Sequence, residues 1–126
     1  MTDEIKPAFQ SGRSVVGVTD QIVDGVVVLS VRDVIDAATA PALTVAIENA
    51  LGGAPAGVII DLSAVTFLAS AGMTVLMKAR ERAGADTGFA VVANSPATSR
   101  PLTLLGLDSE LTLCATVEDA LRRLKG

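Results

Sequence analysis

The chain has 126 residues, half of them hydrophobic and 19% charged, with a net charge of −4 at pH 7. These values predict one globular domain with a sizeable core, and the acidic balance argues against nucleic acid or an anionic membrane surface as the partner. The sequence contains one cysteine and no histidine, which excludes a disulfide framework and a Ser-His or Cys-His nucleophile within the chain.

These absences set the expected class of function. Without histidine or a cysteine cluster, we expect no metal site, no cofactor and no catalytic residue, so the chain is not expected to be an enzyme. The glycine-rich run Gly52–Gly57 lacks the lysine of a phosphate-binding loop and precedes a strand rather than a helix. No apolar run is long enough to span a bilayer, and the N-terminus lacks the pattern of a signal peptide, which predicts a cytoplasmic protein.

The first elements of the chain are an arm and two strands. Residues 1–12 are polar and predict a flexible N-terminal arm, followed by one domain over residues 13–126. Val15–Val18 and Gly25–Val31 have the apolar, β-branched composition of strands. Asp24 and Gly25 form the kind of pair that closes a tight hairpin between two such strands.

A helix is predicted next, and its ends are marked by residue type. Thr39 is placed to cap it, and Pro41 suits its first turn. Leu43 and Ile47 give the helix an apolar face. The pair Gly52-Gly53 is expected to end it.

The stretch from Gly57 to Leu76 is the most informative part of the chain. Val58–Ile60 form a β-branched apolar run that predicts a central strand covered on both faces. Phe67 and Leu68 are expected to return the chain to the core, after which a helix begins at Ser70. A serine hydroxyl at that place can cap a backbone N–H group, or it can carry a phosphate that the helix N-terminus tolerates.

The helix after Ser70 has two different faces. At about 100° per residue, its core stripe consists of Gly72, Val75, Leu76, Ala79 and Ala83. The opposite face carries Ser70, Thr74, Met77 and Glu81, with Met73 on its shoulder. The two methionines are either a small adaptable patch for protein contact or side chains that another loop covers. On the first interpretation, Met73→Ala weakens partner binding more than it lowers stability.

Three further elements complete the chain. Phe89–Ala93 predicts a strand, and Ser95-Pro96 opens a helical segment that Pro101 either kinks or delays. Leu111–Cys114 can form a short edge strand, and Thr116–Asp119 has the pattern of a helix cap before a last helix. The order ββαβαβαβα predicts an α/β domain with a mixed sheet of about four or five strands and about four helices packed on it.

Four motifs in this sequence resemble the STAS family, named for sulphate transporters and anti-sigma factor antagonists. The most specific is Asp61-Leu-Ser-x-Val-x-Phe-Leu-x-Ser70-x-Gly72. Supporting matches are Ile35-Asp36-Ala-Ala-Thr39-Ala40-Pro41-x-Leu43, Ser95-Pro96 and Leu105–Asp108. The resemblance covers roughly residues 13–125. Within the family, the sequence is similar to the small bacterial anti-sigma factor antagonists rather than to transporter tails.

The resemblance implies a protein that switches partners. In that group, the unmodified antagonist binds an anti-sigma factor that is also a serine kinase, and so frees a sigma factor. Phosphorylation of the serine matching Ser70 breaks the complex, and a phosphatase restores it. The implied partner-binding residues are Asp36, Thr39, Ala69, Ser70, Met73, Thr74 and Met77. The chain is then expected to be a monomer or a weak dimer. Asp36 is expected to lie on the same rim of the domain as Ser70, because both residues follow strands that are predicted to run side by side.

The sequence departs from the family pattern in three places. Ala69 stands where the family usually has aspartate, and Ala71 stands where it has serine or threonine. Asp33-Val34 stands where Gly-Glu is common. The replacement at Ala69 favours an alternative, a STAS interaction module without a phosphorylation switch. A second alternative is a sensor of a nucleotide or another small molecule.

Overall fold

The computed structural model describes residues 17–125 and begins with a β-hairpin. Strand β1 (Gly17–Val23) pairs antiparallel with β2 (Val26–Ile35) along its whole length. Asp24 and Gly25 join them with φ angles of 51° and 82°, the left-handed geometry that a two-residue hairpin loop requires. The predicted turn is confirmed, but β1 continues to the turn instead of ending at Val18. The predicted arm over residues 1–12 lies outside the described residues, as do residues 15 and 16.

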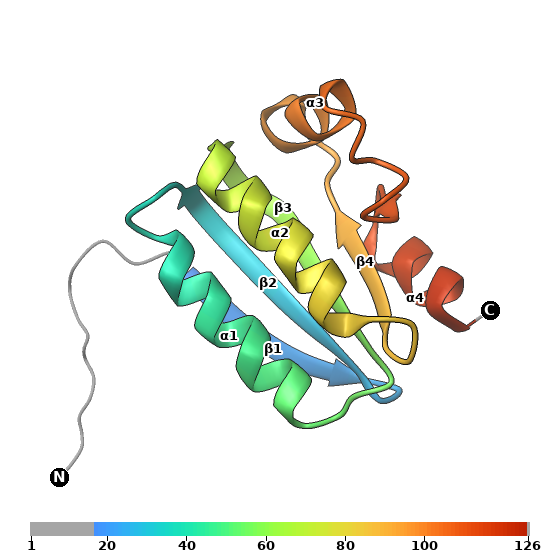
Figure 1. Cartoon of the computed structure of the whole chain (residues 1–126). Helices are drawn as coiled ribbons and strands as arrows, with labels where there is room; N and C mark the ends of the chain where they lie inside the picture. Colours follow the sequence, from blue (N-terminus) through green and yellow to red (C-terminus); the bar gives the residue numbers. More distant parts are fainter. Residues whose placement is uncertain (1–16, 126) are drawn as a thin grey trace, which may run out of the picture.

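The described residues form one five-stranded mixed sheet with the order β1-β2-β3-β4-β5 (Figure 1). The remaining strands are β3 (Gly57–Leu68), β4 (Gly88–Val92) and β5 (Leu113–Cys114), and β2 to β5 run parallel. β3 lies in the middle, and Val58, Ile59 and Ile60 are fully buried there. The prediction of a central strand covered on both faces is therefore confirmed, and so is the predicted α/β fold class.

Four helices in residues 17–125 cover the two faces of this sheet: α1 (Ala40–Gly52), α2 (Ser70–Ala83), α3 (Pro96–Leu104) and α4 (Val117–Lys125). α1 and α2 lie side by side across one face, while α4 lies on the other (Figure 1). Leu43 of α1 and Leu76 of α2 are fully buried in the larger core, and Ala120 of α4 lies in the smaller one. α3 begins at Pro96, so Pro101 does not delay it.

The carboxyl end of β3 differs from its predicted form. The strand has 12 residues, and its pairing with β2 shifts register between Ser30 and Arg32 and again between Asp33 and Val34. Leu68 is buried as predicted, but Phe67 is 54% exposed. Beyond Leu62, where the register shifts against β2, the buried residues of β3 are three apart instead of alternate, and Phe67 lies outside the core. The expectation that both residues return to the core was wrong for Phe67.

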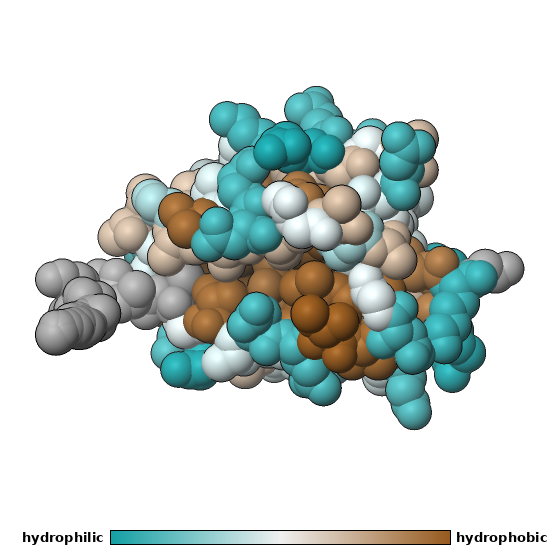
Figure 2. Space-filling view, turned by 90° about the horizontal axis from the view of Figure 1, so that it is seen from below, coloured by the Kyte–Doolittle hydropathy of each residue, from teal (hydrophilic) through white to brown (hydrophobic). Residues whose placement is uncertain are grey.

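The molecule has two rims, defined by the ends of the parallel strands. The carboxyl ends of β2, β3 and β4 lie at the upper rim of Figure 1, near the start of α2. The view from below shows apolar surface across the middle of the opposite side of the molecule (Figure 2). No helix in the described part of the chain has the length and apolar character needed to cross a membrane.

Candidate functional site

The residues predicted to form the site come together at the upper rim because β2 and β3 are parallel. Ile35 at the end of β2 pairs with Leu68 at the end of β3. The backbone N–H of Ala69 donates to the carbonyl of Ile35 at 2.9 Å, which fixes the start of α2 against the end of β2. Asp36 and Ser70 therefore follow neighbouring strands on the same rim of the domain, as predicted. The carboxyl ends of such strands are the usual place for binding sites in α/β proteins.

Ser70 is the first residue of α2, and its side chain is exposed. Ala69 holds the N-cap position, with the extended backbone that a cap requires, and within the described residues no side chain caps this helix. The capping role considered for Ser70 is therefore wrong, because the residue lies one position too far into the helix. Thr74 donates a hydrogen bond from its hydroxyl to the carbonyl of Ser70 at 3.1 Å.

The loop between β2 and α1 is held by Asp36 and Thr39. The Asp36 carboxylate accepts hydrogen bonds from the backbone N–H groups of Ala38 at 3.0 Å and Thr39 at 3.1 Å. The Thr39 hydroxyl accepts from the N–H of Asp36 and donates to the carbonyl of Val34, both at 2.9 Å. Thr39 thus closes the loop instead of capping α1, which corrects the prediction. Because Thr39 is buried, it shapes the rim from within.

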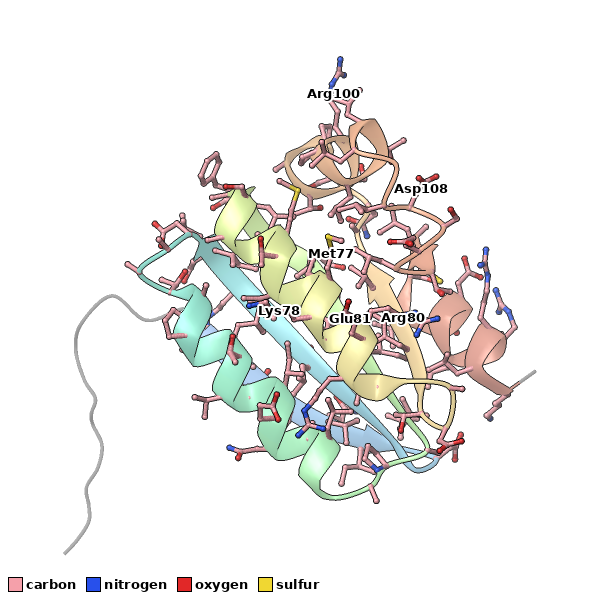
Figure 3. The ribbon with its side chains drawn as sticks, viewed as in Figure 1. Met77, Lys78, Arg80, Glu81, Arg100 and Asp108 are labelled. Carbon is pink, nitrogen blue, oxygen red and sulfur yellow. The ribbon has the colours of Figure 1, made fainter. Side chains whose placement is uncertain are left out.

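The two methionines of α2 have different environments. Met77 is 41% exposed, whereas Met73 is half-buried and packs against the larger core. Figure 3 shows Met77 on the side of α2 that faces the segment after α3, and Lys78 on the side that faces α1. The interpretation of a contact patch therefore suits Met77, and the interpretation of a covered side chain suits Met73.

Phe67 is the site residue that the sequence reasoning missed. It lies three residues before Ser70 at the end of β3, and more than half of its side chain is exposed. A large aromatic side chain exposed beside a polar rim is typical of a protein contact. No local signal indicates this exposure, because burial at the end of β3 falls on every third residue, Leu62, Val65 and Leu68, rather than on alternate ones.

One departure from the family pattern has a conformational explanation. Asp33 has a φ angle of 72°, in the left-handed region, next to a register shift between β2 and β3. Glycine adopts this conformation most easily, and aspartate is one of the few other residues that tolerate it. The backbone at this position therefore keeps the form that a glycine would give it.

The ion pairs and the cysteine involve none of the residues predicted to form the site. The side-chain ion pairs within residues 17–125 join Glu48 to Arg82, Asp24 to Lys125 and Asp119 to Arg122. Burial raises the pKa of the Cys114 thiol, an effect that Arg123 opposes and Asp119 reinforces. A thiol with a raised pKa stays protonated at neutral pH and is a poor nucleophile. Residues 17–125 contain no group of histidine, cysteine and carboxylate side chains that could hold a metal ion.

The comparisons with known proteins agree on one family. Residues 18–120 match the family model described as the STAS domain. Anti-sigma-F factor antagonist RsfB of Mycobacterium tuberculosis is 43% identical over 103 residues, which cover 82% of this chain and 84% of the relative. The crystal structure of an anti-sigma factor antagonist from Mycobacterium paratuberculosis is 44% identical, with a TM-score of 0.85 over 88% of this chain and 95% of that chain. The phosphorylated form of the Bacillus cell fate determinant SpoIIAA is 20% identical and shares the fold, with a TM-score of 0.62 over 86% of this chain and 99% of that chain.

Proposed function

Because this chain belongs to the STAS domain family, we propose that it acts as an anti-sigma factor antagonist, which binds an anti-sigma factor and so releases a sigma factor. The relative from Mycobacterium tuberculosis carries that function in its name and matches most of both chains. The observation that carries the proposal is the position of Ser70. This exposed residue begins α2 on the rim where β2 and β3 end. The antagonist acts by binding, in the bacterial cytoplasm, and performs no catalytic step of its own.

The proposed contact surface is the Ser70 rim, which we define as the loop at Asp36, the end of β3 at Phe67 and the outer face of α2 as far as Met77. Phe67 and Met77 supply exposed apolar area, and Ser70 and Thr74 are exposed polar residues between them in the sequence. An apolar contact with a polar part of this kind is common at interfaces between proteins. Ala69 is half-buried at the start of α2 and brings no charge beside the serine.

Phosphorylation of Ser70 is the proposed switch. A phosphoserine adds roughly −1.5 to −2 charges at neutral pH, and the N-terminus of α2 favours negative charge at that place. The modification removes no cap from α2, because the Ser70 hydroxyl does not cap the helix. The antagonist can therefore carry the phosphate without unfolding. A partner packed on Phe67 and Met77 would have to bury the charge, and burial of an unpaired charge is costly.

The kinase is proposed to be the anti-sigma factor itself, and a separate phosphatase reverses its action. Ser70 is the one hydroxyl residue among the first four residues of α2, since Ala71, Gly72 and Met73 follow it. The site of modification is thereby restricted to Ser70 within this turn. Ala69 favours the second candidate, a module that binds its partner without a switch, because the family's acidic residue before the serine is missing.

Intact-mass measurement separates these two candidates. The chain is incubated with ATP and each anti-sigma factor kinase recovered with it from the native cell. The switch predicts a gain of a single phosphoryl group, which Ser70→Ala abolishes. Ser63→Ala is the matched control, since Ser63 is also exposed but its hydroxyl is held by the Asp61 carboxylate at 2.6 Å. If the recovered kinase phosphorylates another antagonist but leaves this chain unchanged, the result would support the second candidate, the module that binds its partner without a switch.

A further inference from the structure

The outer edge of β1 pairs with no other strand within residues 17–125, and most side chains of this strand are exposed. β1 is the edge strand of the sheet, and within residues 17–125 it pairs with β2 alone. Ile22 of this strand is 72% exposed, although its cross-strand neighbour Val27 is buried. An open strand edge presents unpaired backbone N–H and C=O groups that can pair with a further strand.

A groove of about 660 Å³ lies between this strand and α1. We call it the β1 groove and define it by its described lining residues: Val18, Asp20, Ile22, Gly25, Val27, Leu29, Ala46, Asn49, Ala50, Gly53, Ala54, Pro55 and Ala56. The groove exists because α1 presents small alanine side chains to β1, and these do not reach across to the strand. Figure 2 looks toward this side of the molecule from below and shows its apolar surface. Val45 of α1, which directly precedes the lining residue Ala46, is also an exposed apolar residue.

Asp20 is the one charged residue among the described residues that line the β1 groove. Val18, Asp20 and Ile22 are alternate residues of β1, so their side chains lie on the same face of the strand. They form a row in which a carboxylate stands between two apolar side chains. A strand paired to this edge would place its own alternate side chains about 4.5–5.5 Å from that row.

We propose that the β1 groove binds an extended peptide segment of a partner protein, which adds a strand to β1 and carries a lysine or arginine between two apolar residues. The cation pairs with Asp20, and the apolar side chains lie beside Val18 and Ile22. Backbone hydrogen bonds to the open edge supply affinity, and the alternating side chains supply specificity, as in other cases of strand addition. The groove is lined by β1, the C-terminal half of α1 and the loop after it, so this site is distinct from the Ser70 rim.

The charge of Asp20 argues for such a segment rather than a second copy of this chain. Antiparallel pairing of two β1 strands about their middle residue would place two Asp20 carboxylates opposite each other. Like charges directly opposite each other in a sheet are destabilising. A charge on an edge strand also discourages association between edges in general, and a basic residue in the peptide removes that penalty for one kind of partner.

The probe is a fluorescein-labelled peptide of sequence Thr-Val-Ser-Lys-Ser-Ile-Thr, titrated against the full chain and followed by anisotropy. We expect saturable binding that weakens about tenfold or more in Asp20→Lys, because like charges that meet in a contact disfavour binding. A peptide with glutamate in place of lysine should show the reverse preference. Asp108→Lys is the matched control, since it makes the same charge change at an exposed residue that Figure 3 places near β5, at the opposite edge of the sheet.

The outcomes distinguish this site from the proposed function. Asp20→Lys should leave binding of the anti-sigma factor unchanged, and Ser70→Asp should leave binding of the peptide unchanged. No binding of the lysine peptide, or equal binding by the wild type and Asp20→Lys, would overturn the proposal and leave Asp20 as protection of an open edge. A dimer in sedimentation that Ile22→Lys dissociates would also overturn it and assign the groove to a second copy.

Discussion

The side chains of the Ser70 rim are of two kinds: buried ones that stabilise the rim, and exposed ones that a partner can contact. Thr39 is buried and closes the loop after β2, and Met73 packs against the larger core. Phe67 and Met77 are exposed, and the Ser70 hydroxyl does not cap α2. Substitutions of the first group should therefore change stability, and substitutions of the second group should change recognition.

Phe67→Ala and Met73→Ala test this division between effects on stability and effects on recognition. Phe67→Ala should weaken binding of the anti-sigma factor with little change in the free energy of unfolding, since its side chain is already largely exposed. Met73→Ala should lower stability toward the roughly 2–5 kcal/mol that a fully buried methionine costs, with a smaller effect on binding. This expectation reverses the one that the helical wheel suggests for Met73. Urea denaturation and titration with the anti-sigma factor measure the two effects, and a large loss of stability in Phe67→Ala would contradict the assignment.

Among the elements, α2 owes its position to a close approach at Gly72. A Cβ atom on Gly72 would lie 2.6 Å from Cγ2 of Ile35 and 2.7 Å from Cδ1 of Leu68. These two residues end β2 and β3, so the contact sets how closely the helix that begins at Ser70 lies on the sheet. A larger residue here would push the start of α2 outward or force its neighbours out of their preferred rotamers.

Gly72→Ala should lower the free energy of unfolding by about 1–3 kcal/mol, the usual cost of overpacking a core. This loss should exceed the gain of roughly 0.5–1 kcal/mol that alanine brings to a helix interior. Gly52→Ala is the matched control, because Gly52 also lies in a helix and no described residue comes within 4 Å of its added Cβ. The denaturation midpoints of the two variants are compared with that of the wild type, and only Gly72→Ala should show a marked decrease. Equal stability of Gly72→Ala and the wild type would show that the contact is not tight.

For the complete domain, the order of helices and strands could be predicted because it depends on local patterns. The β-branched run at Val58–Ile60, the hairpin pair Asp24-Gly25 and the cap at Thr116 are each visible within a few residues. The Thr116 hydroxyl does accept from the N–H of Asp119 at 3.0 Å. The expectation that Asp36 and Ser70 follow strands running side by side also placed them on one rim, which the parallel pairing of β2 and β3 confirms.

Most of the errors concern features that a local sequence pattern does not show. The exposure of Phe67 accompanies register shifts between β2 and β3, which no local pattern reveals. The hydroxyl of Thr39 bonds to a residue five positions earlier, because the loop folds back on β2. The polar residues Thr19–Gln21 belong to β1 although they lack an apolar pattern, since an edge strand exposes much of its surface. The groove beside β1 depends on how α1 packs and could not be predicted from either segment alone.

The contact between this chain and its anti-sigma factor is most directly tested by calorimetric titration of Ser70 variants. Ser70→Ala should keep both affinity and stability, because the hydroxyl does not cap α2. Ser70→Asp and Ser70→Glu should fold normally, since an acid near a helix N-terminus is favourable by roughly 0.3–1 kcal/mol. Both acidic variants should lose affinity for the partner, whereas Asn49→Asp, which adds a charge on α1 away from the Ser70 rim, should not. Equal affinity of the wild type and both acidic variants would contradict the switch at Ser70.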